Sequence, residues 1–173
     1  MAANPDLDFD TLVRITAPAL HRTALLLTGG DHHLAEDLLQ TTYVKVWVAW
    51  KRVSRADDPV AYTRTVLTRT FLSHRRLRRS SERPTDELGL SESPVPGGGP
   101  DPVLRLDMVD ALRRLSPTDR AVVVHRYWLD RSVAETAADL ALSEAGVRTR
   151  SKRALSRLRT QFTDLDLDPR EDS

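Results

Sequence analysis

A segment rich in proline and glycine divides this chain of 173 residues into two blocks. Residues 80–102 read SSERPTDELGLSESPVPGGGPDP, and they hold five of the ten prolines and four of the seven glycines. Their apolar residues are too few to offset the conformational entropy that ordering would remove. We therefore predict a flexible linker here, which at about 3.1 Å per residue reaches on the order of 70 Å.

Both blocks show the apolar periodicity of helices. In the first block this spacing runs from Phe9 to Leu27, with an interruption expected near Pro18, and resumes over 34–50 and 60–71. In the second block, Ser116-Pro117-Thr118-Asp119 and Ser132-Val133-Ala134-Glu135 are typical of capping boxes that open helices. No run alternates long enough to indicate a strand. The predicted fold class is all-α, with two small helical domains and a helix-turn-helix in the second.

Composition excludes several classes of protein. The chain has no cysteine, which rules out disulfide scaffolds, thiolate zinc sites and cysteine nucleophiles. No apolar run approaches the ~18 residues of a membrane span, and the N-terminus lacks the features of a signal peptide. We therefore expect a cytoplasmic protein without membrane insertion.

Charge is distributed unevenly along the chain. Residues 1–50 hold three basic and six acidic side chains, whereas residues 51–83 hold ten basic and three acidic ones. This asymmetry indicates a polyanionic partner for one surface. The basic run His74–Arg79 fits phosphate attraction, although the same cations would also suit the negative end of a helix dipole.

The most specific local pattern is Val133–Arg159, which predicts two short helices joined by a tight turn, the second of them basic. Arg148, Thr149, Lys152, Arg153 and Arg157 are expected to face away from the core, as in a helix that enters the major groove. A solvated basic helix that ends a small bundle remains the alternative.

A second pattern, AEDLLQTTYVKVWVAW at Ala35–Trp50, predicts a helix with two apolar faces. Its inner face would carry Leu38, Leu39, Tyr43, Val46 and Trp50. Its outer face would carry Asp37, Gln40, Thr41, Val44 and Val48, with Trp47 at the edge. We favour a protein-binding surface over complete burial, because a three-helix unit can hardly cover such a helix on all sides.

Enzymatic and metal-binding functions find little support. His33, Glu36 and Asp37 lie near helical ligand spacing, but a di-metal bundle would need a second such set facing them. The sequence also contains no phosphate-binding loop, nucleophile elbow or matched Ser/His/Asp arrangement. We expect no enzyme, no cofactor and no metal, and a helical metalloenzyme remains a distant alternative.

These patterns occur in an order that resembles a known family. LLLTGGDHHLAEDLLQTTYVKVW in the first block and LRRLSPTDRAVVVHRYWLDRSVAETAADLALSEAGVRTRSKRALSRLR in the second carry the likeness, which spans about residues 8–160. The chain resembles the extracytoplasmic-function (group IV) sigma factors of the sigma-70 family, and among them the actinobacterial SigE-type subfamily.

The resemblance implies a function and a division into domains. A sigma factor binds the core of bacterial RNA polymerase and directs promoter-specific initiation of transcription. Residues 1–79 would form a region 2-like domain for core docking and for recognising and melting the minus-ten box. Residues 80–102 would be the linker, residues 103–163 a region 4-like domain for the minus-thirty-five box, and residues 164–173 an acidic tail. The alternative is an autonomous helix-turn-helix regulator whose first domain senses or dimerises.

The resemblance also implies partners and the residues that meet them. The β′ clamp helices would dock on Asp37, Gln40, Thr41, Val44 and Trp47, and the β flap on the apolar outer surface of the second domain. Minus-ten DNA would meet Arg55, Asp58, Tyr62, Arg64, Arg69, Arg75, Arg76 and Arg79. Minus-thirty-five DNA would meet Ser143, Glu144, Arg148, Thr149, Lys152 and Arg153. An anti-sigma factor is an implied inhibitory partner.

Three positions depart from the family pattern. Ala141 stands at the turn where the family usually has glycine, and Ala145-Gly146 replaces the usual Gly-Thr. The missing hydroxyl at Gly146 removes a candidate phosphate contact. Thr70 stands where relatives commonly carry asparagine, which bears on how the minus-ten box is read.

Overall fold

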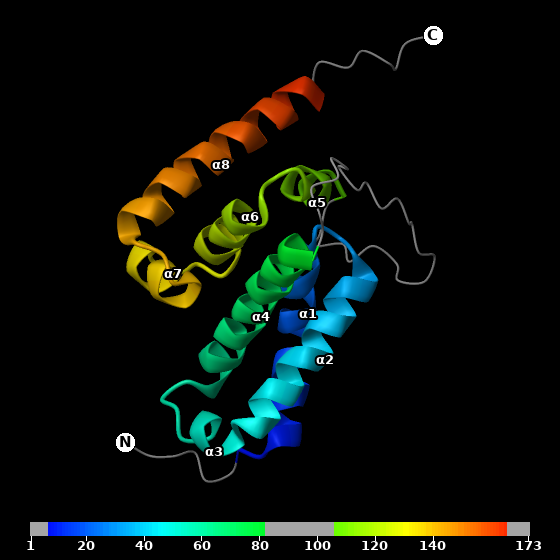
Figure 1. The fold of residues 1–173 in the computed structure, drawn as a ribbon, viewed down its shortest axis with the longest axis vertical. Coiled ribbons are helices and arrows are strands. Elements are labelled where there is room, and N and C mark those ends of the chain that lie inside the picture. The colour runs from blue at the N-terminus through cyan, green and yellow to red at the C-terminus, as the bar shows by residue number, and fades with distance from the viewer. Residues whose placement is uncertain (1–6, 82–105, 166–173) are drawn as a thin grey trace.

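The parts of the protein that the computed structural model describes, residues 7–81 and 106–165, consist of helices joined by short turns and loops (Figure 1). The first half, residues 7–81, contains α1 (Phe9–Thr28), α2 (His32–Val48), the short α3 (Trp50–Val53) and α4 (Pro59–Ser81). The second half, residues 106–165, contains α5 (Leu106–Arg113), α6 (Pro117–Val123), the π-helical turn η1 (Val124–Trp128), α7 (Val133–Leu140) and α8 (Glu144–Leu165). The all-α prediction is confirmed. The predicted linker, except Ser80 and Ser81, and most of the acidic tail lie outside the described residues.

Local sequence signals fix several helix ends. The carboxylates of Asp31 and Asp58 accept hydrogen bonds from the backbone N–H groups of Leu34 and Ala61, at 2.9 and 2.8 Å, and so cap α2 and α4. At the start of α7, Ser132 and Glu135 form the complete predicted capping box. Only one half of the capping box expected at Ser116 forms. The Ser116 hydroxyl accepts from the Asp119 N–H and caps α6, whereas the Asp119 carboxylate contacts Arg153 of α8.

Two details differ from the sequence prediction. Helix α1 continues through Pro18 without a break, because Pro18 and Arg14 lie on its exposed face, where water can satisfy the freed carbonyl. Buried Leu12 and Leu20 hold the opposite face on either side of the proline. The second helix of the helix-turn-helix, α8, is not short but extends over 22 residues.

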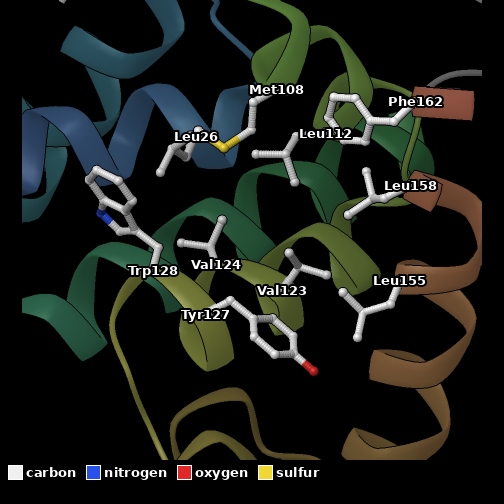
Figure 2. Close-up of a pocket in the computed structure, with 10 residues that line it drawn as sticks. All are labelled: Leu26, Met108, Leu112, Val123, Val124, Tyr127, Trp128, Leu155, Leu158 and Phe162. Atoms are coloured by element: carbon white, nitrogen blue, oxygen red, sulfur yellow. The ribbon is translucent and has the colours of Figure 1, made fainter. Parts of the chain in front are cut away.

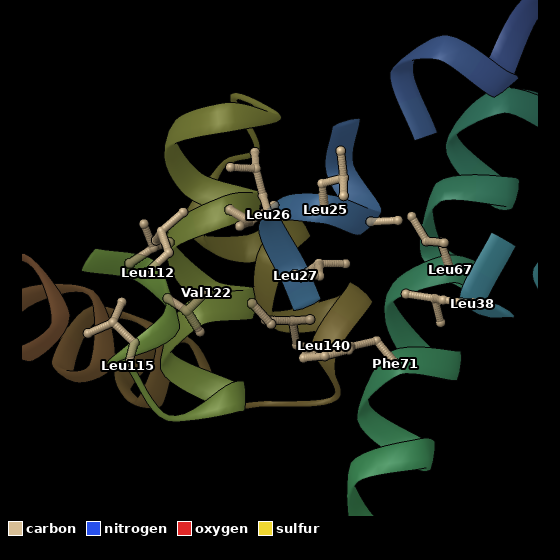
Figure 3. Close-up of a cluster of buried hydrophobic side chains, with 14 of the residues drawn as sticks. Leu25, Leu26, Leu27, Leu38, Leu67, Phe71, Leu112, Leu115, Val122 and Leu140 are labelled. Carbon is tan, nitrogen blue, oxygen red and sulfur yellow. The ribbon is translucent and has the colours of Figure 1, made fainter. Parts of the chain in front are cut away.

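One hydrophobic core extends across both halves (Figure 3). Leu25, Leu26 and Leu27 at the end of α1 lie between Leu67 of α4 and a group from the second half that includes Leu112, Leu115 and Val122. Leu140 of α7 lies beside Phe71 of α4, so the second half also reaches α4 directly. A smaller cluster of Leu12, Val46 and Val53 closes the other end of the first half. The two halves therefore pack against each other instead of standing apart.

Candidate functional site

The outer face of α2 is an exposed apolar stripe. Val44, Trp47 and Val48 are 62%, 60% and 82% exposed. Asp37 and Gln40 are exposed on the same helix and Thr41 is half-buried, whereas Leu38 and Val46 are buried on the inner face. The ring of Phe9 packs edge-on against Trp47, with centroids 4.9 Å apart, which holds the indole in place on the surface. The predicted two-faced helix is therefore present, and its outer face is open.

The loop before α4 and the first turn of that helix hold three of the eight candidate minus-ten residues, Arg55, Asp58 and Tyr62. Arg55 is exposed, and Asp58 is both exposed and the cap of α4. The guanidinium of Arg52 lies over the Tyr62 ring, 5.7 Å from its centroid, in a cation–π contact that the sequence did not indicate.

Farther along α4, the candidate residues differ in how open they are. Arg64 is half-buried and Arg69 is exposed. The backbone of Arg75, Arg76 and Arg79 lies in the last turns of α4, and their side chains are outside the described parts. Thr70 is buried, and its hydroxyl accepts a hydrogen bond from Lys45 Nζ at 3.1 Å. In this structure Thr70 therefore links α4 to α2 and does not face solvent.

The turn of the helix-turn-helix is built around an alanine in the left-handed region. Ala141 has φ 53° and ψ 46°, and its N–H donates to the carbonyl of Ala137. Leu142 N–H donates to the same carbonyl at 2.9 Å. This is the conformation that favours glycine at a helix C-terminus, so Ala141 carries strain that glycine would avoid. Helix α8 then begins with the Ser143 hydroxyl accepting from Gly146 N–H at 3.1 Å.

All six candidate minus-thirty-five residues lie on the exposed side of the turn and α8: Ser143, Glu144, Arg148, Thr149, Lys152 and Arg153. Val147 and Ala154 bury the other side of the same helix. Arg148 Nη2 pairs with Glu144 Oε2 at 2.8 Å, so this ion pair joins the first two turns of α8 on its exposed side. Arg157 is also exposed, as predicted.

A buried carboxylate ties the basic helix to α6. The Asp119 side chain is 1% exposed, and its Oδ2 lies 2.7 Å from Arg153 Nη2. Its Oδ1 accepts from Arg150 Nη1 at 2.9 Å. Burial by itself would raise the pKa of the Asp119 carboxyl, but the hydrogen bonds from Arg153, Arg150 and Ser116 outweigh it and hold the pKa below its ordinary value. Arg153 is thus a structural partner of α6 as well as an exposed cation.

An apolar groove of about 570 Å³ opens beside the helix-turn-helix (Figure 2). Its walls come from α1, α5, α6, η1 and α8. Tyr127, Leu155 and Phe162 are 53%, 37% and 39% exposed along it. Its other lining residues are Leu26, Met108, Leu112, Val123, Val124, Trp128 and Leu158. The apolar outer surface expected on the second half is therefore concave, and Leu26 of the first half forms part of its wall.

Polar side chains join α4 to the second half, and sequence reasoning missed them. Thr65 Oγ1 donates to Asp139 Oδ1 at 3.0 Å, and Thr68 Oγ1 lies 2.9 Å from His125 Nε2. Arg69 Nε donates to the Asp139 carbonyl and its Nη2 to the Ala138 carbonyl, both at 3.2 Å. These partners are 57 to 74 residues apart, so no local pattern could have revealed them.

The carboxylate of Asp139 is the centre of this group. His125 Nδ1 lies 3.5 Å from its Oδ2, and Arg131 Nε lies 3.4 Å from the same oxygen. Burial would raise the pKa of Asp139, but the contacts with His125 and Thr65 and the positive charge of Arg131 keep that pKa below its ordinary value. The carboxylate is thus held in its charged form between the two halves.

The described residues do not bring together three or more side chains that could hold a metal ion, so the His33, Glu36 and Asp37 hypothesis gains no support from the geometry. Across the same residues, none of the helices combines the length and apolar character that a bilayer crossing requires.

Both halves match family models. Residues 12–81 match the model described as Sigma-70 region 2, and residues 105–158 match the one described as Sigma-70, region 4. The chain is 37% identical over 164 residues to the RNA polymerase sigma-E factor of Streptomyces coelicolor. The aligned region covers 95% of this chain and 91% of that protein. It is 33% identical over 152 residues to the ECF RNA polymerase sigma factor SigL of Mycobacterium tuberculosis, covering 86% and 85%.

Among solved structures, the fold is similar to the sigma factor RpoE from Bartonella quintana, which was determined in complex with the anti-sigma factor NepR. The TM-score is 0.69 and the sequence identity 27%, and the match covers 93% of this chain and 98% of that one. The likeness therefore includes both halves of the protein.

Proposed function

The chain belongs to the sigma-70 family of RNA polymerase sigma factors, and from this premise we propose how its surfaces carry out promoter-specific initiation of transcription. It binds the polymerase core and promoter DNA, as sigma factors do. We infer that it acts in the cytoplasm and catalyses no step of its own, since the family consists of initiation factors. An anti-sigma factor is a further proposed partner, supported by the complex in which its structural relative was solved.

We propose that residues 1–79 act as the region 2 domain and residues 103–163 as the region 4 domain, joined by the linker at 80–102 and followed by an acidic tail at 164–173. A chain that contacts two promoter boxes and one enzyme gains avidity, because each contact raises the effective concentration of the next. The matches to the two family models support this division.

The observation that carries the proposal is the exposed apolar stripe of α2. Val44, Trp47 and Val48 are the kind of large apolar group that soluble proteins usually bury, and they lie together on one helix face. Asp37, Gln40 and Thr41 border them with polar groups, as at the rim of a protein interface. We assign this stripe to the β′ clamp helices of the polymerase.

The cations of the loop before α4 and of α4 itself are assigned to minus-ten DNA. Extruding a base from a duplex costs a few kcal/mol, so a melted strand needs a surface that binds it. Arg55, Tyr62, Arg64 and Arg69, with Asp58 and the later Arg75, Arg76 and Arg79, supply cations and one aromatic ring for that purpose. Stacking on aromatic rings and attraction to phosphates are the usual means of holding single strands.

The exposed side of α8 is assigned to the minus-thirty-five box. Residues near the start of a recognition helix reach base edges, while more distal cations reach phosphates. Arg148 and Thr149 lie in that early part, and Lys152 follows one turn later. We assign the apolar groove beside Tyr127 and Phe162 to the β flap, since its lining and its exposure suit an apolar partner.

The test is in vitro transcription with core polymerase on a promoter library, with and without the protein, combined with a core-binding measurement. Specific transcripts should require the protein. A Val44→Asp variant should bind core at least about tenfold more weakly, because burying a valine is worth roughly 1.5–3 kcal/mol and a charge in its place would remain unpaired.

Ile15→Asp is the matched control, because Ile15 is 54% exposed on α1, outside the stripe. Its core affinity should stay near that of the wild type. Equal core affinity for Val44→Asp and the wild type would overturn the assignment of the stripe. Tight and specific binding to duplex promoter DNA by the protein alone, without transcription, would favour the autonomous regulator instead.

A further inference from the structure

Two carboxylates pair with all three arginines in the first half of α8. Glu144 Oε2 lies 2.8 Å from Arg148 Nη2, on the exposed side of the helix. Asp119 Oδ1 lies 2.9 Å from Arg150 Nη1, and its Oδ2 lies 2.7 Å from Arg153 Nη2. These five side chains together therefore keep only a single net positive charge.

Asp119 reaches its two arginines from the neighbouring helix. It lies in the first turn of α6, which packs against α8 (Figure 1). Its side chain is buried, whereas those of Arg150 and Arg153 are 35% and 49% exposed. Burial opposes ionisation of this carboxyl, but the hydrogen bonds from both arginines hold its pKa below the ordinary value, so it is charged at neutral pH. The pairing is therefore built into the packing of the two helices.

This arrangement is unusual for a helix that is assigned to DNA. A duplex carries one negative charge per ~1.7 Å, so it attracts unpaired cations and repels carboxylates. Within the described parts of the chain, Lys152 and Arg157 on the exposed side of α8 make no ion pair. The three arginines that precede Ala154 have less charge to offer phosphates than their number indicates.

We propose that Asp119 and Glu144 limit the sequence-independent affinity of α8 for DNA, so that binding depends on base contacts and on the other sites of the protein. The inference rests on the proposed function, since it takes α8 as the helix that enters the major groove. Attraction to the DNA backbone grows with each phosphate that a cation neutralises, because each one releases condensed counterions. An arginine that already faces a carboxylate neutralises a phosphate less completely and releases fewer counterions.

The pairs weaken attraction to the backbone more than they weaken base recognition. The bond to Glu144 uses Nη2 of Arg148, and the remaining guanidinium nitrogens keep N–H groups for a base edge. A base edge is recognised by the directions of its hydrogen-bonding groups, whereas a phosphate is attracted mainly by net charge. A genome offers about 10⁶–10⁹ competing non-specific sites, so a low affinity for the backbone leaves more of the protein free to bind the polymerase core.

The test is the salt dependence of DNA binding by the full chain. A fluorescently labelled duplex of scrambled sequence is titrated with protein at about 50–200 mM salt, and the affinity is read from fluorescence anisotropy. Glu144→Gln and Asp119→Asn each remove one negative charge and keep the shape of the side chain. Each should steepen the slope of log K against log salt concentration by about 0.9, so the affinity lost over this range should grow about threefold, and about tenfold in the double variant. Because Glu144 is exposed, its replacement carries the test even if Asp119→Asn lowers stability.

Asp110→Asn is the matched control. Asp110 is exposed on α5, and its Oδ1 lies 3.8 Å from Arg113 Nη2, so this substitution adds the same charge to the protein outside α8. The slope of this variant should equal that of the wild type. Adding Arg148→Gln to Glu144→Gln also removes the released cation, and should return the slope to the wild-type value.

A wild-type slope in Glu144→Gln, and in Asp119→Asn where circular dichroism shows its helix content intact, would overturn the proposal. It would fail equally if Asp110→Asn steepened the slope as much, or if no variant bound the duplex at about 50 mM salt. A wild-type chain that supports no transcription with core polymerase would contradict the proposed function instead, while steeper slopes in the two variants would still establish the charge limit on α8.

Discussion

Replacing the strained alanine of the helix-turn-helix should stabilise the protein. Ala141 has φ 53°, a conformation that costs a residue with a Cβ roughly 1–2 kcal/mol. Glycine avoids that strain but loses about 0.5–1 kcal/mol more conformational entropy on folding. The side chain of Ala141 is exposed, so Ala141→Gly gives up no packing. The free energy of unfolding should therefore rise by about 0.5–1 kcal/mol, and the melting temperature by about 1–4 °C for a chain of this size.

The measurement is urea unfolding of the full chain followed by far-ultraviolet circular dichroism, with Ala138→Gly as the matched control. Ala138 is also exposed, but it lies within α7, where glycine costs about 1 kcal/mol relative to alanine. The two substitutions should therefore act in opposite directions. If Ala141→Gly left stability unchanged or lowered it, the left-handed strain would not exist in solution, and the explanation of this departure from the family pattern would be wrong.

Two further predictions concern the second half. Ser132→Ala removes the capping box of α7 and should lower the free energy of unfolding by about 1 kcal/mol in urea, whereas Ser156→Ala on the exposed side of α8 should change little. Because the pKa of Asp119 is held below its ordinary value, its contribution should be present above about pH 4 and be lost as the pH falls through the lowered value. Thermal melts between pH 7 and pH 2 should show a smaller loss for Asp119→Asn than for the wild type; equal losses would contradict this.

The features that sequence could predict are those that depend on near neighbours. The caps at Asp31, Asp58 and Ser132 bind backbone groups three residues away, so each can be recognised within one helical turn. The exposed stripe on α2 follows from the 3.6-residue period in the same way. The prediction of a break at Pro18 failed because the cost of a proline depends on which face of the helix it occupies, and that is set by packing.

The contacts between the halves could not be predicted, for a related reason. Nothing in the sequence near Thr65, His125 or Asp139 marks them as partners, and only the docking of the second half on α4 brings them together. The sequence pattern predicted Asp119 as part of a capping box but did not predict its contact with α8. Its place in a capping motif is visible in the sequence, but its contact with Arg153 spans 34 residues.

The interface between the halves has a composition suited to opening. Its polar contacts can exchange their partners for water at a small net cost, as interdomain interfaces commonly do. The apolar part of the interface would instead be exposed to water at a cost in free energy. Leu26 belongs to this part, because it is a first-half residue that forms one wall of a groove otherwise lined by the second half. Separation of the halves would remove that wall and expose more of the apolar surface around Met108 and Trp128. A partner that covers this surface binds the open state better than the closed one, and by that difference alone shifts the equilibrium toward opening.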